Sequence, residues 1–284
     1  MQLLKFVLAS LICFNTIWVK AQQPLNVMTF NIRLNTASDS LNAWPYRKDI
    51  AASEVKFYDV HILGVQEALY DQMQDLQQRL TQYKHAGVGR EDGKIKGEFS
   101  AIFYDTTRLI CLKDATFWLS QTPETVGAKG WDAALPRIVT WCFFEDRISH
   151  ATFYAFNTHF DHMGKQARSE SAKLLLQKVK EIAGDLPAIV TGDFNATYDD
   201  EPIKIITDNN NPDRLTDTKF ISQTPHYGPS GTFTGFKSKE VSDKAIDHIF
   251  VKNTVTVLKH ATLSESWNGR FSSDHFPVLA VVQL

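Results

Sequence analysis

The chain has 284 residues, with 30 Lys and Arg against 32 Asp and Glu, and a formal net charge of −2 at pH 7. This balance argues against nonspecific polyanion binding, because such binding depends on basic side chains that neutralise phosphates. It makes nucleic acid a less expected substrate without excluding it. No Pro/Gly/Ser-rich linker or charge block divides residues 22–284, so we expect one α/β domain there.

The first 21 residues have the pattern of a signal peptide. Lys5 gives a positive start, residues 6–19 are mostly apolar, and Ala21 ends a small-residue cleavage site. A membrane span needs ~20 apolar residues, so an uncleaved anchor is the less favoured alternative. Cleavage after Ala21 removes two lysines and no acid, which moves the net charge from −2 to −4. We expect an exported monomer, periplasmic or extracellular, with no stable membrane span.

Apolar runs typical of strands alternate with runs of helical periodicity along the chain. Strands are expected at residues 25–30, 60–65, 99–104, 109–119, 138–144, 152–156, 188–191, 245–251, 255–258 and 278–282. Helices are expected at residues 46–58, 70–80 and 165–182, and the last of these has the clearest apolar stripe. The alternation predicts an α/β protein.

The two halves of the chain carry a similar strand–helix–strand unit. In the first half the two strands end at Asn31 and Glu67, and in the second half they end at Asn157 and Asp193. The spacing is the same, since 67 − 31 and 193 − 157 are both 36. Two such half-units predict a four-layer α/β sandwich, in which two mixed, mainly antiparallel sheets pack together and helices flank them.

Several polar residues follow or interrupt strands that are otherwise apolar, and strand ends are where α/β folds hold their sites. These residues are Asn31, Glu67, His159, Asp193, Asn195, Asp247, Asp274 and His275. Each alone has an ordinary explanation, because a buried Asp commonly accepts structural hydrogen bonds and an Asn is common in turns. Together they supply oxygen ligands for a cation, amide donors for a phosphate and a base for a water, which phosphoester hydrolysis needs.

In this order the motifs resemble the endonuclease/exonuclease/phosphatase superfamily, which includes pancreatic deoxyribonuclease, abasic-site endonucleases, bacterial sphingomyelinases and deadenylases. The matching segments are TFNIR (29–33), GVQE (64–67), NTH (157–159), GDFN (192–195), IDHI (246–249) and SDHFP (273–277). They span nearly all of the mature chain. The resemblance is specific for the superfamily and says little about the substrate.

The resemblance implies a division of roles. Glu67 would be the principal Mg²⁺ carboxylate, with Asn31 beside it and Asp274 near the metal or a second acidic ligand; Mn²⁺ is an alternative ion. Such a set suits Mg²⁺, which prefers oxygen ligands and keeps several waters.

The same resemblance assigns the chemistry. Asp193 and Asn195 would orient the attacking water and stabilise the transition state. His159 and His275 would contact phosphate oxygens, with His275 the better general base and Asp247 fixing its tautomer. A glutamate that pairs with the first histidine of the family matches Glu98, although a solvated glutamate explains Glu98 almost as well.

Three residues are candidates for substrate binding. Arg33 matches the deoxyribonuclease-like members, whereas abasic-site endonucleases carry an acid there, so abasic-site repair is disfavoured. Arg137 opens a strand and would reach a phosphate, although an ordinary ion pair explains it equally well. Trp131 lies in a glycine-containing loop and would stack on a base or sugar ring, or else pack into the core.

The sequence therefore predicts an exported, Mg²⁺-dependent phosphoesterase that hydrolyses a phosphodiester or a phosphomonoester with an activated water. A nonspecific secreted endonuclease acting on DNA or RNA is the alternative. A binding module without turnover is less favoured, because such a protein would lack one of the core residues and none is missing. Cys111 and Cys142 lie in apolar strand-like runs, so two free thiols are favoured over a disulfide.

Overall fold

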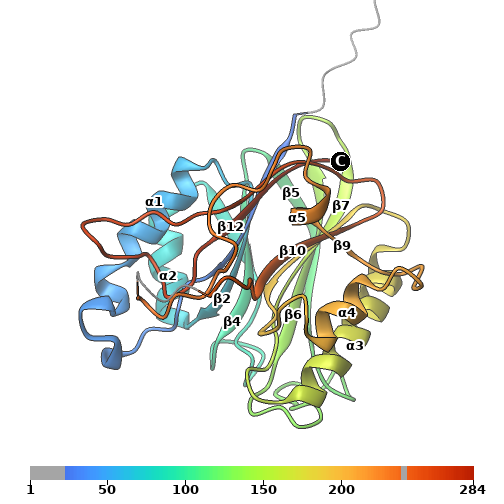
Figure 1. The fold of residues 1–284 in the computed structure, drawn as a ribbon, viewed down its shortest axis with the longest axis horizontal. Helices are drawn as coiled ribbons and strands as arrows, with labels where there is room; N and C mark the ends of the chain where they lie inside the picture. Colours follow the sequence, from blue (N-terminus) through green and yellow to red (C-terminus); the bar gives the residue numbers. More distant parts are fainter. Residues whose placement is uncertain (1–22, 238–241) are drawn as a thin grey trace, which may run out of the picture.

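The computed structural model describes residues 23–237 and 242–284, so the predicted signal peptide lies outside the described part of the chain. The described residues form two six-stranded sheets that pack face to face, with helices on the outer side of each (Figure 1). The predicted four-layer sandwich is therefore confirmed. None of the described helices has the length and apolar character needed to cross a membrane.

The first sheet has the strand order β11-β12-β1-β2-β4-β3. Its strands are β1 (Leu25–Asn31), β2 (Ile62–Ala68), β3 (Tyr83–Ala86), β4 (Phe99–Asp105), β11 (Thr256–Thr262) and β12 (Val278–Gln283). Two short 3-10 helices, η1 (Ala37–Asn42) and η2 (Trp44–Tyr46), precede helix α1 (Lys48–Phe57), and helix α2 (Tyr70–Arg79) follows β2. Helices α1 and α2 share an apolar cluster with the outer face of this sheet, through residues such as Val55 and Leu76.

The second sheet has the strand order β5-β6-β7-β8-β10-β9. Its strands are β5 (Leu109–Trp118), β6 (Ile138–Asp146), β7 (Thr152–His159), β8 (Ala188–Asp193), β9 (Thr216–Asp217) and β10 (Asp247–Lys252). Helices α3 (Lys165–Ala183) and α4 (Glu201–Thr207) cover its outer face, and α5 (Thr218–Ile221) follows β9. Cys111 on β5 is half-buried and Cys142 on β6 is buried, and both are free thiols.

The predicted similarity of the two halves is visible in the strand pairing. Each sheet has one parallel pair at its centre, β1 with β2 and β7 with β8, and the other pairs of named strands are antiparallel. A parallel pair needs a crossover, which α1 provides in one half and α3 in the other. The elements that the sequence did not predict are short: β3, β9, α4 and α5 have between two and seven residues.

An apolar cluster fills much of the space between the two sheets, and a polar contact lies near the edge where the central parallel strands end. There Asn157 on β7 joins the two sheets. Its Oδ1 accepts hydrogen bonds from Gln66 Nε2 (2.6 Å) and Thr191 Oγ1 (3.0 Å). Its Nδ2 donates to the carbonyls of Val65 (2.8 Å) and Ala101 (2.9 Å), next to a shift in the β2–β4 register. A buried amide with this many partners fixes how the sheets face each other.

Gly64 on β2 makes room for this polar contact. A Cβ at Gly64 would lie 2.3 Å from Thr191 Oγ1 and 2.5 Å from Asn157 Oδ1. Both atoms are held by buried hydrogen bonds, so they cannot move away without losing them. We expect Gly64→Ala to lower the free energy of unfolding by about 3 kcal/mol or more, measured by urea denaturation.

The control for this prediction is Gly184→Ala at the end of α3. A Cβ there would meet nothing within 4 Å, so the substitution is opposed only by its φ of +57°. With a ψ of −120° this conformation lies outside the left-handed α region, and the strain costs about 1–3 kcal/mol. Equal losses for the two variants would contradict the close approach of the sheets at Gly64.

Candidate active site

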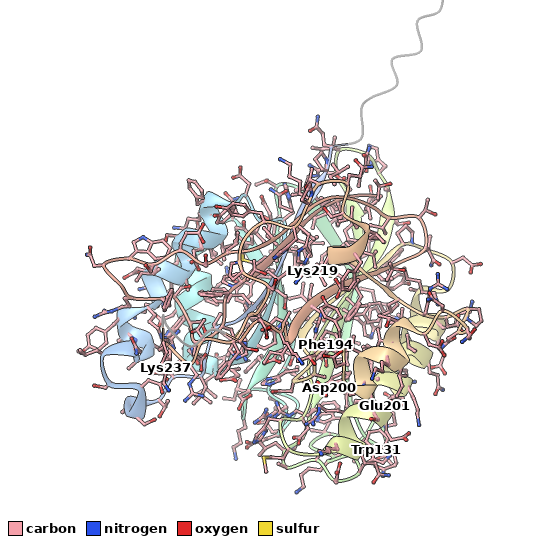
Figure 2. All side chains as sticks on the ribbon, in the orientation of Figure 1. Trp131, Phe194, Asp200, Glu201, Lys219 and Lys237 are labelled. Atoms are coloured by element: carbon pink, nitrogen blue, oxygen red, sulfur yellow. The ribbon has the colours of Figure 1, made fainter. Side chains whose placement is uncertain are left out.

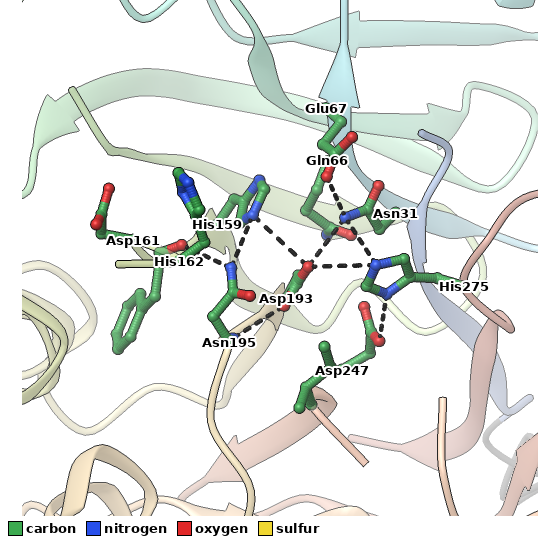
Figure 3. Close-up of polar contacts among 12 residues, drawn as sticks. Asn31, Gln66, Glu67, His159, Asp161, His162, Asp193, Asn195, Asp247 and His275 are labelled. Atoms are coloured by element: carbon green, nitrogen blue, oxygen red, sulfur yellow. Dashed lines mark hydrogen bonds and ion pairs between the residues drawn. The ribbon is translucent and has the colours of Figure 1, made fainter. Parts of the chain in front are cut away.

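The predicted site residues meet at the edge of the sandwich where the central strands end. Asn31, His159 and Asp193 are the last residues of β1, β7 and β8, and Glu67 is the next-to-last residue of β2. Their side chains point toward one another from the two sheets (Figure 3). A pocket of about 470 Å³ lies beside them, and all the predicted site residues line it except Asn31, Asp247 and Trp131.

Asp193 lies at the centre of this arrangement. One carboxylate oxygen, Oδ2, accepts a hydrogen bond from Asn31 Nδ2 at 2.9 Å, and the other accepts one from the backbone N–H of Asn195 at 2.9 Å. The Nε2 atoms of His159 and His275 lie 3.6 and 3.8 Å from Oδ2. Burial, followed by the charge of Asp247 opposite it on β10, raises the pKa of Asp193. One carboxylate thus faces both histidines.

His275 forms a buried pair with Asp247. Its Nδ1 is 2.9 Å from Asp247 Oδ2, and its Nε2 faces Asp193. Burial opposes the charged imidazolium, but the hydrogen bond and charge of Asp247 outweigh it and raise the pKa of His275. The ring of Phe233 packs edge-on against the imidazole with the centroids 5.0 Å apart. The sequence-based prediction that Asp247 pairs with His275 agrees with this geometry.

Asn31 uses its amide group to hold two carboxylates together. Its Nδ2 donates to Glu67 Oε1 at 3.0 Å as well as to Asp193, and its Oδ1 accepts from the backbone N–H of Arg33 at 3.0 Å. Glu67 has a positive φ of 61° and accepts a further hydrogen bond from the backbone N–H of Leu34 at 3.1 Å. In this arrangement the amide oxygen faces away from the carboxylates, so a ligand role for Asn31 stays a prediction.

Arg33 lies between the acidic groups at the rim of the pocket. It makes two hydrogen bonds to Asp39, at 3.0 and 3.1 Å, and its guanidinium is 3.8 Å from both Glu67 and Asp274. Its charge is therefore largely balanced by Asp39. The buried Arg47 fixes the backbone beside Arg33, because it donates hydrogen bonds to the carbonyls of Ile32, Arg33 and Ser272.

His159 and Asn195 form the side of the site opposite His275. Asn195 Nδ2 donates to the carbonyl of Phe160 and also lies 3.0 Å from His159 Nε2. Because that amide group is the donor, His159 Nε2 must accept, and the imidazole carries its proton on Nδ1. Burial, followed by the charge of Arg137, holds the pKa of His159 well below its ordinary value, which agrees with a neutral ring.

Glu98 faces His159 as predicted, but its hydrogen bonds go elsewhere. Its Oε2 is 3.8 Å from His159 Nδ1, beyond hydrogen-bond distance, and this nitrogen has no other partner. Both oxygens of Glu98 instead accept from Arg90, at 2.8 and 2.7 Å. Arg90 was missed from the sequence, because only the hairpin that folds residue 90 back onto residue 98 makes them partners.

The two remaining substrate candidates have different outcomes. Arg137 lines the pocket, 3.2 Å from Asp161 and 2.9 Å from His162. Trp131 does not line it and instead borders a separate groove beside α3, with Gln121 and Leu174 among its neighbours (Figure 2). Trp131 has a positive φ of 51°. The prediction that Trp131 contacts the substrate in the site is therefore wrong for this pocket.

The donor atoms fit a divalent cation. Burial, followed by the nearby charge of Glu67, raises the pKa of Asp274, while the charges of His275 and Arg33 oppose this shift. Glu67 and Asp274 offer the hard oxygen ligands that Mg²⁺ prefers. Asp193, Asp247 and His275 also present ligand atoms within 4.8 Å of one another and form a second possible site. Because Asp247 and His275 already share a hydrogen bond, we favour the first set.

Comparison with known proteins identifies the family to which this chain belongs. The model of the endonuclease/exonuclease/phosphatase family matches residues 28–275. This protein belongs to that family. An endonuclease/exonuclease/phosphatase structure from Bacteroides vulgatus is 40% identical, covers 93% of this chain and 100% of its own, and superimposes with a TM-score of 0.88.

Two further relatives are informative. A mannosyl-6-phosphatase from Bacteroides thetaiotaomicron is 37% identical over 92% of this chain and 100% of its own, with a TM-score of 0.86. An uncharacterized protein of Acanthamoeba polyphaga mimivirus is 26% identical over 91% of this chain and 100% of its own. The family hydrolyses phosphoesters and typically depends on a divalent metal, so the reaction class that the sequence predicted is confirmed at this coarser level.

Proposed function

We propose that this protein is an exported, Mg²⁺-dependent phosphatase that releases phosphate from a small polar phosphomonoester. The observation that carries the proposal is the pocket of about 470 Å³, which is bordered by Asp193, Asn195 and the two histidines. Ligand pockets of about 300–1,000 Å³ suit small molecules. The similarity to a mannosyl-6-phosphatase over nearly the whole length of both chains supports the same substrate class.

The residues of the site have different roles in the proposed hydrolysis. His275 Nε2 takes the proton of the attacking water, and Asp247 holds the imidazole with its proton on Nδ1. Asp193 and Asn195 orient that water and the phosphate, and His159 lies beside Asn195 on the side of the pocket opposite His275. Glu67 and Asp274, with Asn31 beside them, hold Mg²⁺ or Mn²⁺, which when bound neutralises charge on the phosphate oxygens. The protein acts as a monomer after removal of residues 1–21.

The distribution of charge disfavours the nuclease alternative. A nuclease groove needs basic side chains that are free to neutralise phosphates along a strand. The arginines around this pocket are already paired, Arg33 with Asp39, Arg90 with Glu98 and Arg137 with Asp161. The formal charge of the whole chain is −2. The binding-module alternative is disfavoured because every residue that the reaction needs is present.

A phosphate-release assay tests the proposal. Protein beginning at residue 22 is incubated with Mg²⁺ or Mn²⁺ and with hexose phosphates, 4-nitrophenyl phosphate, bis(4-nitrophenyl) phosphate or DNA. We expect the monoesters to be hydrolysed at least about tenfold faster than the diesters. EDTA should abolish turnover and added Mg²⁺ should restore it. Faster cleavage of DNA or the diester, or turnover that persists in EDTA, would contradict the proposal.

A further inference from the structure

Arg47, between η2 and α1, is a buried cation that joins distant parts of the backbone. Its residue exposure is 0%. Its Nη1 donates to the carbonyl oxygens of Ile32 at 2.8 Å and of Ser272 at 2.7 Å. Its Nη2 donates to the Arg33 carbonyl at 3.3 Å, and its Nε donates to the carbonyl of Asn42. Within the described residues, the guanidinium therefore forms hydrogen bonds with backbone carbonyls and with no carboxylate.

Two aromatic rings hold this guanidinium in place. Its Cζ lies 5.5 Å from the ring centroid of Trp44 and 5.3 Å from that of Phe236. Cation–π contacts of this kind stabilise a desolvated cation. Burial lowers the pKa of Arg47 to about 10, and the charge of Asp274 opposes that shift, so the guanidinium stays charged at neutral pH.

The segment that follows β1 positions Glu67. The backbone N–H of Leu34 donates to Glu67 Oε2 at 3.1 Å, and Asn31 Nδ2 donates to Glu67 Oε1 at 3.0 Å. Between these two donors, the carbonyl of Ile32 accepts its hydrogen bond from Arg47. A shift of this segment would move both donors away from the Glu67 carboxylate.

The segment that precedes β12 positions Asp274. The carbonyl of Ser272 accepts from the same Nη1 of Arg47 that binds the first segment, and Ser273 Oγ donates to the Asn31 carbonyl at 2.6 Å. One nitrogen thus joins two segments from opposite ends of the described chain. A cation bound by carboxylates from both segments requires that the segments stay at a fixed separation, because Mg²⁺ demands near-ideal geometry at short ligand distances.

We propose that Arg47 is a positioning residue of the cation site, which holds the segments of Glu67 and Asp274 at the separation that Mg²⁺ requires. This inference rests on the proposed function, in which these two carboxylates bind the cation. Arg47 does not line the pocket, and its hydrogen bonds reach the backbone beside the ligands. Replacing residues that orient metal ligands typically costs about 10–100-fold in metal affinity.

The charge of Arg47 and its hydrogen bonds have opposite effects on a bound cation. A buried positive charge near Asp274 and Glu67 disfavours a cation there by repulsion. The hydrogen bonds to the two segments favour the cation by holding its ligands together. Removing the guanidinium therefore strengthens cation binding if the charge decides, and weakens it if the positioning decides.

The experiment measures Mn²⁺ binding to substrate-free protein beginning at residue 22, by isothermal titration calorimetry. We expect Arg47→Lys, which keeps the charge and loses the forked donors, to raise the dissociation constant about 10–100-fold. Arg47→Met should also raise it, although this variant removes the repulsive charge. Glu67→Gln should weaken binding at least as much as Arg47→Lys, which identifies the site that is measured.

Arg108→Lys is the matched control. Arg108 is buried, pairs with Asp146 and donates to the carbonyl of Gln23 at 2.7 Å, and none of these residues lines the pocket. We expect this variant to lower the free energy of unfolding, measured by urea denaturation, while the Mn²⁺ dissociation constant changes less than about twofold. A purely structural role for Arg47 predicts the same pair of results for Arg47→Lys.

Phe236→Leu provides the test if neither Arg47 variant folds. Phe236 is half-buried, and its replacement removes one aromatic face of the guanidinium and leaves the hydrogen bonds of Arg47 in place. We expect the Mn²⁺ dissociation constant to rise about threefold or more.

The outcomes separate this inference from the proposed function. An unchanged or lower Mn²⁺ dissociation constant in either folded Arg47 variant, or in Phe236→Leu where both Arg47 variants unfold, would overturn the inference and leave the phosphatase function standing. Wild-type protein that binds no Mn²⁺ would overturn the inference together with the cation site. Wild-type protein that binds Mn²⁺ and releases phosphate from no monoester would overturn the proposed function alone.

Discussion

Replacing Asp247 by asparagine is expected to lower kcat by about 10²–10⁴-fold while KM and the apparent Mg²⁺ affinity change less than about threefold. Asp247 does not line the pocket, and its Oδ2 lies 2.9 Å from His275 Nδ1. Asparagine keeps the shape and removes the charge, so the imidazole is no longer held in the tautomer that leaves Nε2 free. Steady-state kinetics at several Mg²⁺ concentrations separate these parameters.

The fold supplies a matched control in a second buried Asp–His pair. Asp217 Oδ2 lies 3.0 Å from His248 Nδ1, and neither residue lines the pocket. Asp217 also accepts a hydrogen bond from the Tyr198 hydroxyl at 3.0 Å. We expect Asp217→Asn to lower stability by about 1–3 kcal/mol without lowering kcat. A similar loss of kcat in both variants would mean that the effect of Asp247→Asn is structural.

The Asp247→Asn variant also distinguishes the two candidate metal sites, one formed by Glu67 and Asp274 and the other by Asp193, Asp247 and His275. If Asp193, Asp247 and His275 held the cation, Asp247→Asn would remove a ligand and weaken the metal affinity by at least about tenfold. An effect of that kind, with kcat restored at high Mg²⁺, would contradict the positioning role of Asp247. The corresponding change at Glu67, Glu67→Gln, should then leave the metal affinity unaffected.

Much of the fold was predictable because its signals are local. Strands β1, β2 and β8 are buried on both faces, so each is a nearly continuous apolar run that ends at a polar residue. The end of the run is therefore also the position of the site residue, such as Asn31 or Asp193. The equal spacing anticipated two similar strand–helix–strand units, and the structure pairs the two strands of each unit in parallel.

Other features were not predictable because they depend on residues that tertiary structure brings together. The partner of Arg137 is Asp161, 24 positions away, and the partner of Glu98 is Arg90 across a turn. Trp131 was assigned to the site because its ring suits stacking on a base or sugar, but it borders a separate groove beside α3, a position that the sequence does not indicate. Strand β9 has two residues and exists only through pairing with β10.

Glu54 on α1 is expected to make the folded state less stable as the pH rises. Its residue exposure is 3%, neither of its carboxylate oxygens has a hydrogen-bond partner, and burial raises its pKa from 4.5 to about 8. Below about pH 4.5 the carboxyl is protonated in both states and has no effect. Between about pH 4.5 and 8 the folded state keeps a proton that the unfolded chain gives up. The free energy of unfolding therefore falls across this range.

We expect Glu54→Gln to exceed the wild type in free energy of unfolding by roughly 2–5 kcal/mol at pH 8 and by less than about 1 kcal/mol at pH 5. Urea denaturation at the two pH values measures both differences in the free energy of unfolding. The exposed Glu181 on α3 provides the control, since Glu181→Gln should change stability by no more than about 0.5 kcal/mol. A gap of the same size at both pH values would show that the amide packs better and that ionisation of Glu54 is not the cause. Because Glu54 does not line the pocket, the stabilised variant should keep its kcat, which separates the cost of burying Glu54 from the chemistry at Asp193.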